Sequence, residues 1–249
     1  MLAISNKGTS ARAAGMLLLR HQEPRKGCVN LDGEDVASLD TRDLRKRTFS
    51  LSDEVMIFRG TIAENVLYGQ AVEEARDEAA EQASLASCLE YAGLDRFVNG
   101  LEHGAQSVLK GTDGNESDET AFHVALSVNQ RRRLQLARLF FRNPVFVVVD
   151  RFLDEALLKA SGTATQNFNA EASSMRSAYR RALRQPFHRT VLVCAHTADE
   201  VFSADHGIFI TDGKPVENGK ISALEQNPSS MMKEFVNHEE EAAIRWGFK

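Results

Sequence analysis

Five short apolar runs, rich in β-branched residues, are spread along the chain at residues 2–4, 29–31, 145–149, 191–195 and 207–211. Because most of these runs lack polar residues, they predict strands that are buried on both faces of a sheet. Helical patterns separate them. Residues 71–89 are rich in Ala and Glu, and residues 129–142 place apolar residues at helical spacing with arginines on the opposite face. Strands that alternate with helices predict an α/β fold.

Turn and loop residues divide these elements. Turn residues at 31–34 predict a hairpin over residues 28–36. Asn143-Pro144 predicts the end of the preceding helix, since proline restricts the residue before it. The polar stretch 110–121 predicts a surface loop, and we interpret its run of acidic residues as solvated surface rather than as a metal or partner site.

Length and charge narrow the class of protein. The chain has 249 residues, of which 43% are hydrophobic and 26% charged, as in a folded domain with a sizeable core. A net charge of -5 gives no general attraction for nucleic acid, so we expect no nucleic-acid partner. No apolar run reaches the roughly 20 residues that span a bilayer. We therefore expect a cytoplasmic protein that would reach the cytoplasmic face of a membrane only through a partner.

The first apolar run leads into a segment with the outline of a phosphate-binding loop. Such a loop has the pattern G-x-x-x-x-G-K-[ST], in which glycines let backbone N–H groups approach the phosphates, lysine neutralises them and the hydroxyl binds magnesium. The residues of the predicted remnant loop are Ser5, Gly8, Thr9, Ser10, Ala11 and Arg12. The four defined positions of the pattern are occupied by Ser5, Ser10, Ala11 and Arg12, so the spacing persists without the chemistry.

Later segments carry patterns whose order identifies a family. Residues 126–138 resemble the signature L-S-G-G-Q with its arginine-rich helix, and residues 145–150 resemble a Walker B strand. Residues 58–69 are similar to F-x-G-T-I-x-E-N-I-x-Y-G, which follows the Q-loop in exporters, and residues 190–196 resemble the switch-histidine strand. Over nearly its whole length the chain resembles the nucleotide-binding domain of an ATP-binding-cassette (ABC) transporter of the exporter type.

The resemblance implies a fold. It is a P-loop NTPase core of ABC type at residues 1–52 and 137–249, with an inserted helical subdomain at residues 53–136. The family fold normally begins with an antiparallel strand pair that carries an aromatic residue stacked on adenine, and this chain starts after that pair. We expect a partner chain, or an upstream segment, to supply these strands.

The residues that would act on ATP differ from the family pattern. The lysine that binds the phosphates corresponds to Ala11 and the magnesium-binding hydroxyl to Arg12, which we expect to sit one residue late and to point into the helix. The glutamate that polarises the attacking water corresponds to Arg151, which cannot accept a proton. The Q-loop glutamine corresponds to Asp53, a carboxylate that would repel a triphosphate.

The signature is altered in the same way. Its two glycines are replaced by Val128 and Asn129, whose side chains obstruct the close approach of backbone to a phosphate. Ser127 and Gln130 remain. The D-loop after Walker B reads Asp-Glu-Ala-Leu at residues 154–157 instead of S-A-L-D.

Two catalytic remnants survive, Asp150 at the end of the Walker B strand and His196 at the switch position. For His196 we favour a structural role, since there is no γ-phosphate for it to sense. We assign no catalytic residue, metal ligand or firm cofactor, although a helix start can bind ATP or another anion weakly.

The function that these replacements favour is a catalytically inactive pseudo-ATPase that acts as a structural or regulatory subunit of a transporter. Its partner would be an ABC transmembrane domain, docked near residues 58–68, or an intact ABC ATPase. One alternative is an ATP-binding subunit of an exporter that hydrolyses ATP together with an intact partner. Another is a soluble scaffold that is no longer tied to transport.

Overall fold

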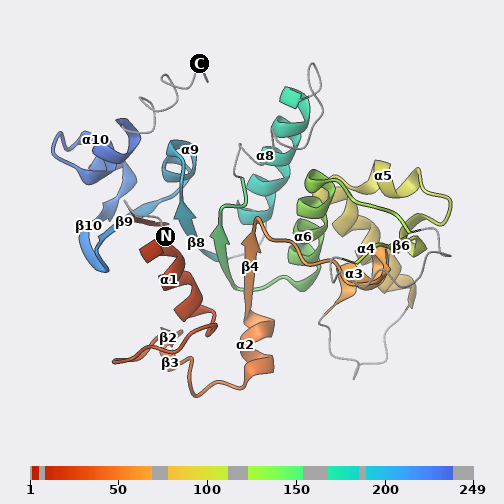
Figure 1. Ribbon diagram of the computed structural model, residues 1–249, viewed down its shortest axis with the longest axis horizontal. Helices are drawn as coiled ribbons and strands as arrows, with labels where there is room; N and C mark the ends of the chain where they lie inside the picture. Colours follow the sequence, from red (N-terminus) through yellow and green to blue (C-terminus); the bar gives the residue numbers. More distant parts are fainter. Residues whose placement is uncertain are drawn as a thin grey trace. The chain divides into compact units, whose positions relative to one another are not determined.

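The computed structural model describes residues 2–5, 9–68, 78–111, 123–153, 168–184 and 189–237, and Figure 1 follows the chain through them. The chain packs as two compact units. Unit 1 comprises residues 1–51, 145–151 and 189–249, and unit 2 comprises residues 52–144 and 152–188. This division into units does not test the domain boundaries predicted from the sequence, and they stay a prediction.

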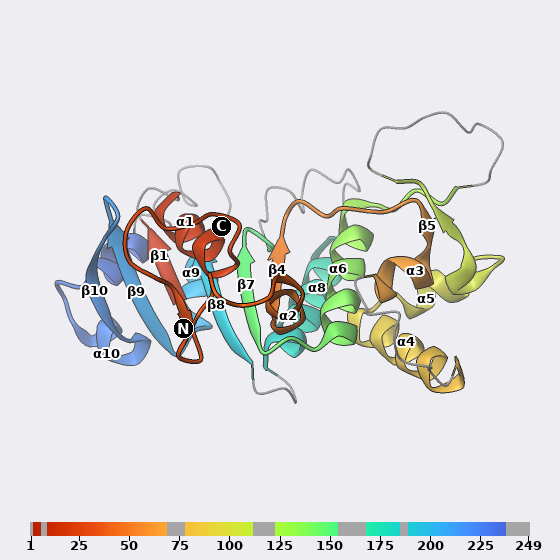
Figure 2. The same ribbon diagram turned by 90° about the horizontal axis from the view of Figure 1, so that it is seen from below.

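Unit 1 is built around a six-stranded sheet with the order β10-β9-β1-β8-β7-β4 (Figure 2). Its strands are β1 (Leu2–Ser5), β4 (Thr48–Ser52), β7 (Phe146–Asp150), β8 (Thr190–Ala195), β9 (His206–Thr211) and β10 (Lys214–Lys220). β1 pairs in parallel with β8 and β9, β7 pairs in parallel with β8, and β10 is antiparallel to β9. Four of the five predicted strands are therefore confirmed as members of this sheet.

The fifth predicted strand, at residues 29–31, is not part of the main sheet. β2 (Asn30–Leu31) pairs with β3 (Glu34–Asp35) in a separate two-stranded sheet, which confirms the predicted hairpin. Its turn residues Asp32 and Gly33 have φ angles of 53° and 88°. Two successive residues in this left-handed region form the tight turn that Asp-Gly favours.

The edge strand β4 has no counterpart among the predicted strands. Thr48, Phe49 and Leu51 are buried, whereas Ser50 and Ser52 are half-buried. A strand whose buried positions include threonine, and which is interrupted by serine, gives no continuous apolar run. The search for apolar runs therefore did not predict this strand, although it packs like its neighbours.

Helix α1 (Thr9–Leu18) packs closely on the sheet of unit 1. A Cβ atom placed on Gly15 would lie 2.7 Å from the Val148 Cγ1 atom of β7, so only glycine allows this approach. Ala11 and Leu192 belong to the same buried cluster. This contact fixes the start of α1 beside the end of β7.

Three shorter helices complete the named elements of unit 1: α2 (Thr41–Arg47), α9 (Ala198–Phe202) and α10 (Ile221–Gln226). Asp40 caps α2, because its carboxylate accepts hydrogen bonds from the backbone N–H groups of Arg42 and Asp43. Residues 231–237 are also helical.

Unit 2 is mainly helical. It contains α3 (Ile62–Leu67), α4 (Glu78–Ala92), α5 (Asp95–Asn99), a 3₁₀ turn (Gly104–Gln106), α6 (Val128–Arg142), α8 (Phe168–Arg184) and the small sheet of β5 (Gly60–Thr61) and β6 (Val108–Leu109). α6 packs against α3, α4 and α8. The predicted helix at 129–142 is confirmed. α4 confirms the predicted helix at 71–89 from residue 78 and extends it to Ala92, while residues 71–77 lie outside the described part.

The face of α6 that carries the arginines is covered by other parts of unit 2. Arg132, Arg133 and Arg138 are all buried. Because α3, α4 and α8 surround α6, its polar face is covered as well as its apolar one. Arg133 shows how the charge is accommodated, since it donates hydrogen bonds to the Ala92 carbonyl at 2.9 Å and to Ser174 Oγ at 3.1 Å.

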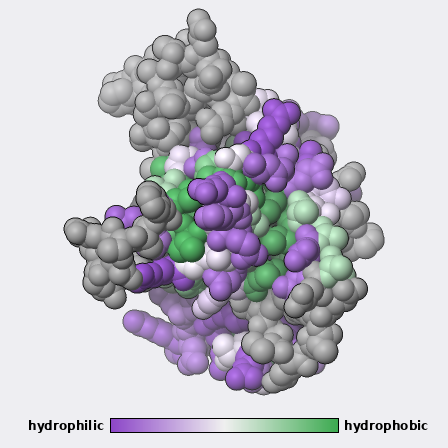
Figure 3. Space-filling view, turned by 90° about the vertical axis from the view of Figure 1, so that its right-hand side faces the viewer, coloured by the Kyte–Doolittle hydropathy of each residue, from purple (hydrophilic) through white to green (hydrophobic). Residues whose placement is uncertain are grey.

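Large apolar side chains are also exposed on unit 2, among them Met56 and Tyr68 with 63% and 56% of their surface accessible. Figure 3 faces the side on which α3, α4 and α5 are labelled in Figure 1, and apolar side chains gather there between polar ones. Within the described ranges, no helix combines the length and the apolar character that a bilayer span requires.

Candidate functional site

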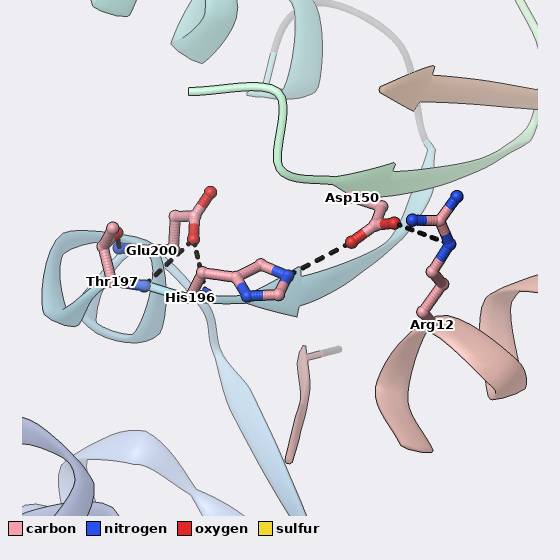
Figure 4. A network of polar contacts seen from close by, with 5 residues as sticks. All are labelled: Arg12, Asp150, His196, Thr197 and Glu200. Atoms are coloured by element: carbon pink, nitrogen blue, oxygen red, sulfur yellow. Dashed lines mark hydrogen bonds and ion pairs between the residues drawn. The ribbon is translucent and has the colours of Figure 1, made fainter. Parts of the chain in front are cut away.

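Unit 1 brings three of the predicted site residues together at one edge of its sheet (Figure 4). Asp150 is the last residue of β7, His196 directly follows β8, and Arg12 lies in the first turns of α1. Since β7 and β8 are parallel, their carboxyl ends meet at the same edge, where ligands bind in open α/β sheets. Asp150 lies between the other two side chains.

Asp150 is the centre of this cluster. Its side chain is 12% exposed. The His196 Nε2–H donates a hydrogen bond to Asp150 Oδ1 at 3.2 Å, and the Arg12 Nε atom lies 3.5 Å from Asp150 Oδ2. The hydrogen bond to Asp150 raises the pKa of His196, against the opposite effect of burial. The carboxylate thus has a cationic or proton-donating partner on each oxygen.

Arg12 is placed differently from the expectation. The prediction that it points into the helix is wrong, because the side chain reaches Asp150 and is 51% exposed. In an α-helix, residues 12 and 15 lie on the same face, and in a strand, residues 148 and 150 do. The contact of Gly15 with Val148 therefore sets Arg12 opposite Asp150.

Glu200 is a site residue that the sequence analysis missed. It is buried, and its Oε2 atom accepts hydrogen bonds from the backbone N–H groups of His196 at 2.8 Å and Thr197 at 3.2 Å. Thr197 Oγ1 in turn accepts from the Glu200 N–H at 3.3 Å. This is a capping box, and its signal T-x-x-E was present in the sequence. Burial raises the pKa of Glu200, although these hydrogen bonds act in the opposite direction.

Cys194 lies under the cluster and takes no part in it. It pairs with Asp150 in the register of β7 and β8 and is buried. Burial, with the nearby carboxylates of Asp150 and Glu200, raises the pKa of this thiol to about 12. A protonated, buried thiol is neither a nucleophile nor a metal ligand at neutral pH.

The remnant phosphate loop is described only in part. Ser5 ends β1, and Thr9 and Ser10 open α1, whereas Gly8 lies outside the described residues. Ala11, which the resemblance assigns to the lysine position, is 2% exposed and belongs to the core. Its side chain is turned away from solvent, where a phosphate would have to bind.

The resemblance assigns Arg151 to the position of the family's catalytic glutamate. It is exposed, and its φ angle of 54° places the backbone in the left-handed region, which is uncommon for a residue with a long side chain. Its positive charge is close enough to oppose protonation of His196. A cation here can neither accept a proton nor polarise a water molecule for attack.

The altered signature belongs to unit 2, where it starts α6. Ser127 and Gln130 form a capping box, with bonds of 2.8 Å from the Ser127 N–H to Gln130 Oε1 and 3.2 Å from the Gln130 N–H to Ser127 Oγ. Val128 is exposed, and Asn129 is buried. Asp53 follows β4 and is half-buried, and the D-loop residues 154–157 lie outside the described part. The two surviving signature residues thus have a structural task.

The resemblance also implies a magnesium ion beside Asp150, which the residues present do not fit. Magnesium requires near-octahedral oxygen ligands at about 2.0–2.1 Å. Arg12, which the resemblance assigns to the position of the ligand hydroxyl, is a cation that already pairs with Asp150. Among the described residues, no three or more His, Cys, Asp or Glu side chains gather in a way that could hold a metal.

The exporter-like segment that begins at Phe58 forms a second candidate site, in unit 2. The rings of Phe58 and Tyr68 stack, with centroids 3.9 Å apart. Asn65 bonds to the backbone of Phe58 through both side-chain atoms, at 2.9 and 3.0 Å. Arg138 of α6 lies over the Phe58 ring and donates to Asn65 and Met56. Burial lowers the pKa of Arg138 to about 10, which leaves it charged at neutral pH.

Similarity to known proteins identifies the family of the chain. A family model described as ABC transporter matches residues 15–156, which is more than half of the sequence. The chain belongs to the ABC transporter family. The resemblance drawn from its motifs is thereby confirmed.

Relatives in this family include transport proteins of bacteria. The chain is 29% identical over 208 residues to a fatty acid ABC transporter ATP-binding/permease protein of Mycobacterium bovis, covering 84% of this chain and 28% of that protein. It is 28% identical over 216 residues to an ATP-dependent lipid A-core flippase of Yersinia pestis, covering 87% of this chain and 32% of that protein. The chain therefore spans about a third or less of the length of these relatives.

A solved structure supports the fold. The structure of a bacterial Atm1-family ABC exporter with ATP bound is similar with a TM-score of 0.68, covering 94% of this chain and 36% of that chain at 20% identity. The P-loop α/β fold of an ABC nucleotide-binding domain is thus confirmed.

Proposed function

We propose that this ABC chain is a pseudo-ATPase, a structural or regulatory subunit of an exporter that does not hydrolyse ATP. The observation that carries the proposal is the pairing of Arg12 with Asp150 at 3.5 Å. Hydrolysis depends on neutralising the phosphate charge and on positioning a water molecule. Here the carboxylate that would serve a metal is bound to an internal cation, and the lysine position is buried in the core.

The position after Asp150 strengthens the proposal. A general base must accept a proton from the attacking water, and Arg151 has no acceptor atom. Glu200 does not replace it, because it is buried away from solvent and two backbone N–H groups at the start of α9 hold its Oε2 atom. The residues that pack the fold still fit the family pattern, whereas the residues at the positions expected to act on ATP differ from it in their chemistry.

The experiment is a phosphate-release assay on the purified full chain with ATP and magnesium. We expect no release above the rate without protein, and nucleotide titration of the same sample should show weak, magnesium-independent binding at most. Steady release that Asp150→Asn abolishes would contradict the proposal. Release only after addition of an intact ABC ATPase would favour the alternative of a shared site.

We further propose that a transmembrane ABC domain docks on the segment from Phe58 to Tyr68. The stacked pair of rings, held by Asn65 and Arg138, presents Tyr68 to solvent on a rigid support. Exposed aromatic side chains in fixed positions are common anchors of interfaces. This partner would bring the chain to a membrane.

The docking proposal is tested by sedimentation with membranes from the source organism. We expect the full chain to sediment with them and Tyr68→Ala to stay in the supernatant. Tyr91→Ala is the matched control, because Tyr91 is also an exposed tyrosine of unit 2, at 46%, outside the segment. Equal sedimentation of both variants would contradict this docking surface, and failure of every form to sediment would favour a scaffold without a transporter.

A further inference from the structure

The carboxylate of Asp150 is satisfied without any bound group. Its two oxygens face His196 Nε2 at 3.2 Å and Arg12 Nε at 3.5 Å, and only 12% of the side chain is exposed. A carboxylate with so little access to water requires a counter-charge, or its burial is costly. Arg12 supplies that charge from another element of the same unit.

The chemistry of Arg12 prevents it from sharing the carboxylate of Asp150 with a metal ion. A guanidinium carries a permanent positive charge and only donors, so it cannot be a metal ligand. A divalent cation bound to Asp150 Oδ2 would have to displace Arg12 or lie against it, and like charges at such a distance repel strongly. The carboxylate of Asp150 can therefore bind either Arg12 or a divalent cation, but not both.

The fold places Arg12 there by register. Gly15, one helical turn after Arg12, contacts Val148, two residues before Asp150. The helix and the strand thus present matching faces, and the long arginine side chain spans the remaining distance. Any residue at position 12 would face Asp150, and a long cationic one reaches it.

We propose that Arg12 is an internal counterion of Asp150 that replaces the divalent cation of an ABC site. It joins the start of α1 to the end of β7, and Asp150 carries the link to His196 after β8 (Figure 4). The edge of the sheet is held together in the absence of metal. This inference rests on the proposed function, since an active ATPase needs the metal.

The test is the melting temperature of the full chain, without nucleotide, in EDTA and in millimolar magnesium at equal ionic strength. The wild type should melt at the same temperature in both. Arg12→Ala should melt roughly 2–6 °C lower, because it leaves a buried carboxylate without its cation. Arg12→Thr should regain part of this loss in magnesium but not in EDTA.

The matched control is Arg47→Ala, which removes another arginine–carboxylate pair of unit 1. Arg47 lies 3.6 Å from Glu34, but both side chains are about half exposed, so its loss should move the melting temperature little. Equal effects of Arg12→Ala and Arg47→Ala would overturn the proposal. A rise of the wild-type melting temperature in magnesium would overturn it as well.

If the Arg12 variants do not fold, a measurement on the wild type tests the counterion proposal. Manganese serves as the probe, and the electron paramagnetic resonance signal of free Mn²⁺ should be unchanged by the protein. A stoichiometric loss of that signal would overturn the counterion proposal. Phosphate release is measured separately, so a metal-binding but inactive chain would contradict the counterion and leave the pseudo-ATPase intact.

Discussion

Arg138 donates a hydrogen bond of 2.9 Å to the side-chain oxygen of Asn65, 73 residues earlier in the chain. The same guanidinium donates to the backbone carbonyls of Asn65 and Met56, both at 2.7 Å. One buried side chain of α6 therefore holds the exporter-like segment by two bonds to Asn65 and the residue just before the segment, Met56, by a third. The helix that begins at the altered signature and the proposed docking surface form one rigid assembly within unit 2.

Replacing this arginine tests that link. Arg138→Ala should lower the free energy of unfolding by about 2–4 kcal/mol, because it removes three hydrogen bonds from a charged donor, two of which are buried. Arg131→Ala on the same helix is the control, and it should cost less because its Nε atom bonds only the Leu126 carbonyl, at 3.1 Å, from a half-buried position. Urea denaturation measures both. Equal losses would mean that Arg138 does not brace the segment.

The close approach of α1 to β7 gives a second prediction. Gly15→Ala should lower the free energy of unfolding by about 1–3 kcal/mol, although alanine favours helices, because the new methyl group would meet Val148 Cγ1 at 2.7 Å. Adding Val148→Ala removes that atom. In a double-mutant cycle, Gly15→Ala should then be harmless or stabilising, and a cost that is independent of Val148 would refute the contact.

Protonation of His196 should make stability depend on pH. The pKa of His196 is raised in the folded state by its hydrogen bond to Asp150, whereas an unfolded histidine has a pKa of about 6.5. The histidine therefore stabilises the fold fully below about pH 6.5, and this contribution disappears as the pH rises through the folded pKa. Chemical denaturation from pH 5.5 to pH 9 measures the loss.

Two variants separate this effect from other titrating groups. His196→Gln should lack the part of the pH dependence of stability that His196 gives the wild type. His103→Gln changes an exposed histidine of unit 2 and should leave the profile unchanged. An identical profile for His196→Gln and wild type would show that the bond to Asp150 carries no stability.

The surviving signature serine should matter for folding. Ser127→Ala breaks the capping box at the start of α6 and should lower the free energy of unfolding by about 1 kcal/mol, while Ser127→Asp should retain most of it. Thermal melting without nucleotide measures both. If Ser127→Ala melts like the wild type, its bond to the Gln130 N–H adds nothing.

The strands were predicted from continuous apolar runs, and this explains which strands were found and which one was missed. Such runs located β7 and β8, which are buried on both faces, but β4 escaped because its polar residues break the run. The burial of Arg132 and Arg133 could not be predicted, because helical spacing shows which face is polar and not whether another helix covers it.

The candidate site shows the same limit. The apolar runs end directly before Asp150 and His196, and the resemblance to the family assigned both residues to the site. The parallel pairing of β7 and β8 brings these strand ends together. The side-chain route of Arg12 depended on the contact of Gly15 with Val148, which joins residues 133 positions apart by their numbers. Glu200 could have been found from its capping pattern with Thr197.

The burial of Ala11 bears on how this chain could evolve. A mutation of Ala11 to lysine would place an ammonium group in a tightly packed interior, where it costs stability before it can contribute to catalysis. If the chain is the pseudo-ATPase proposed above, that single step would not give it ATPase activity, because the substituted protein would fold poorly. Neighbouring apolar residues would have to change first, so selection for activity meets a barrier in the protein's own interior.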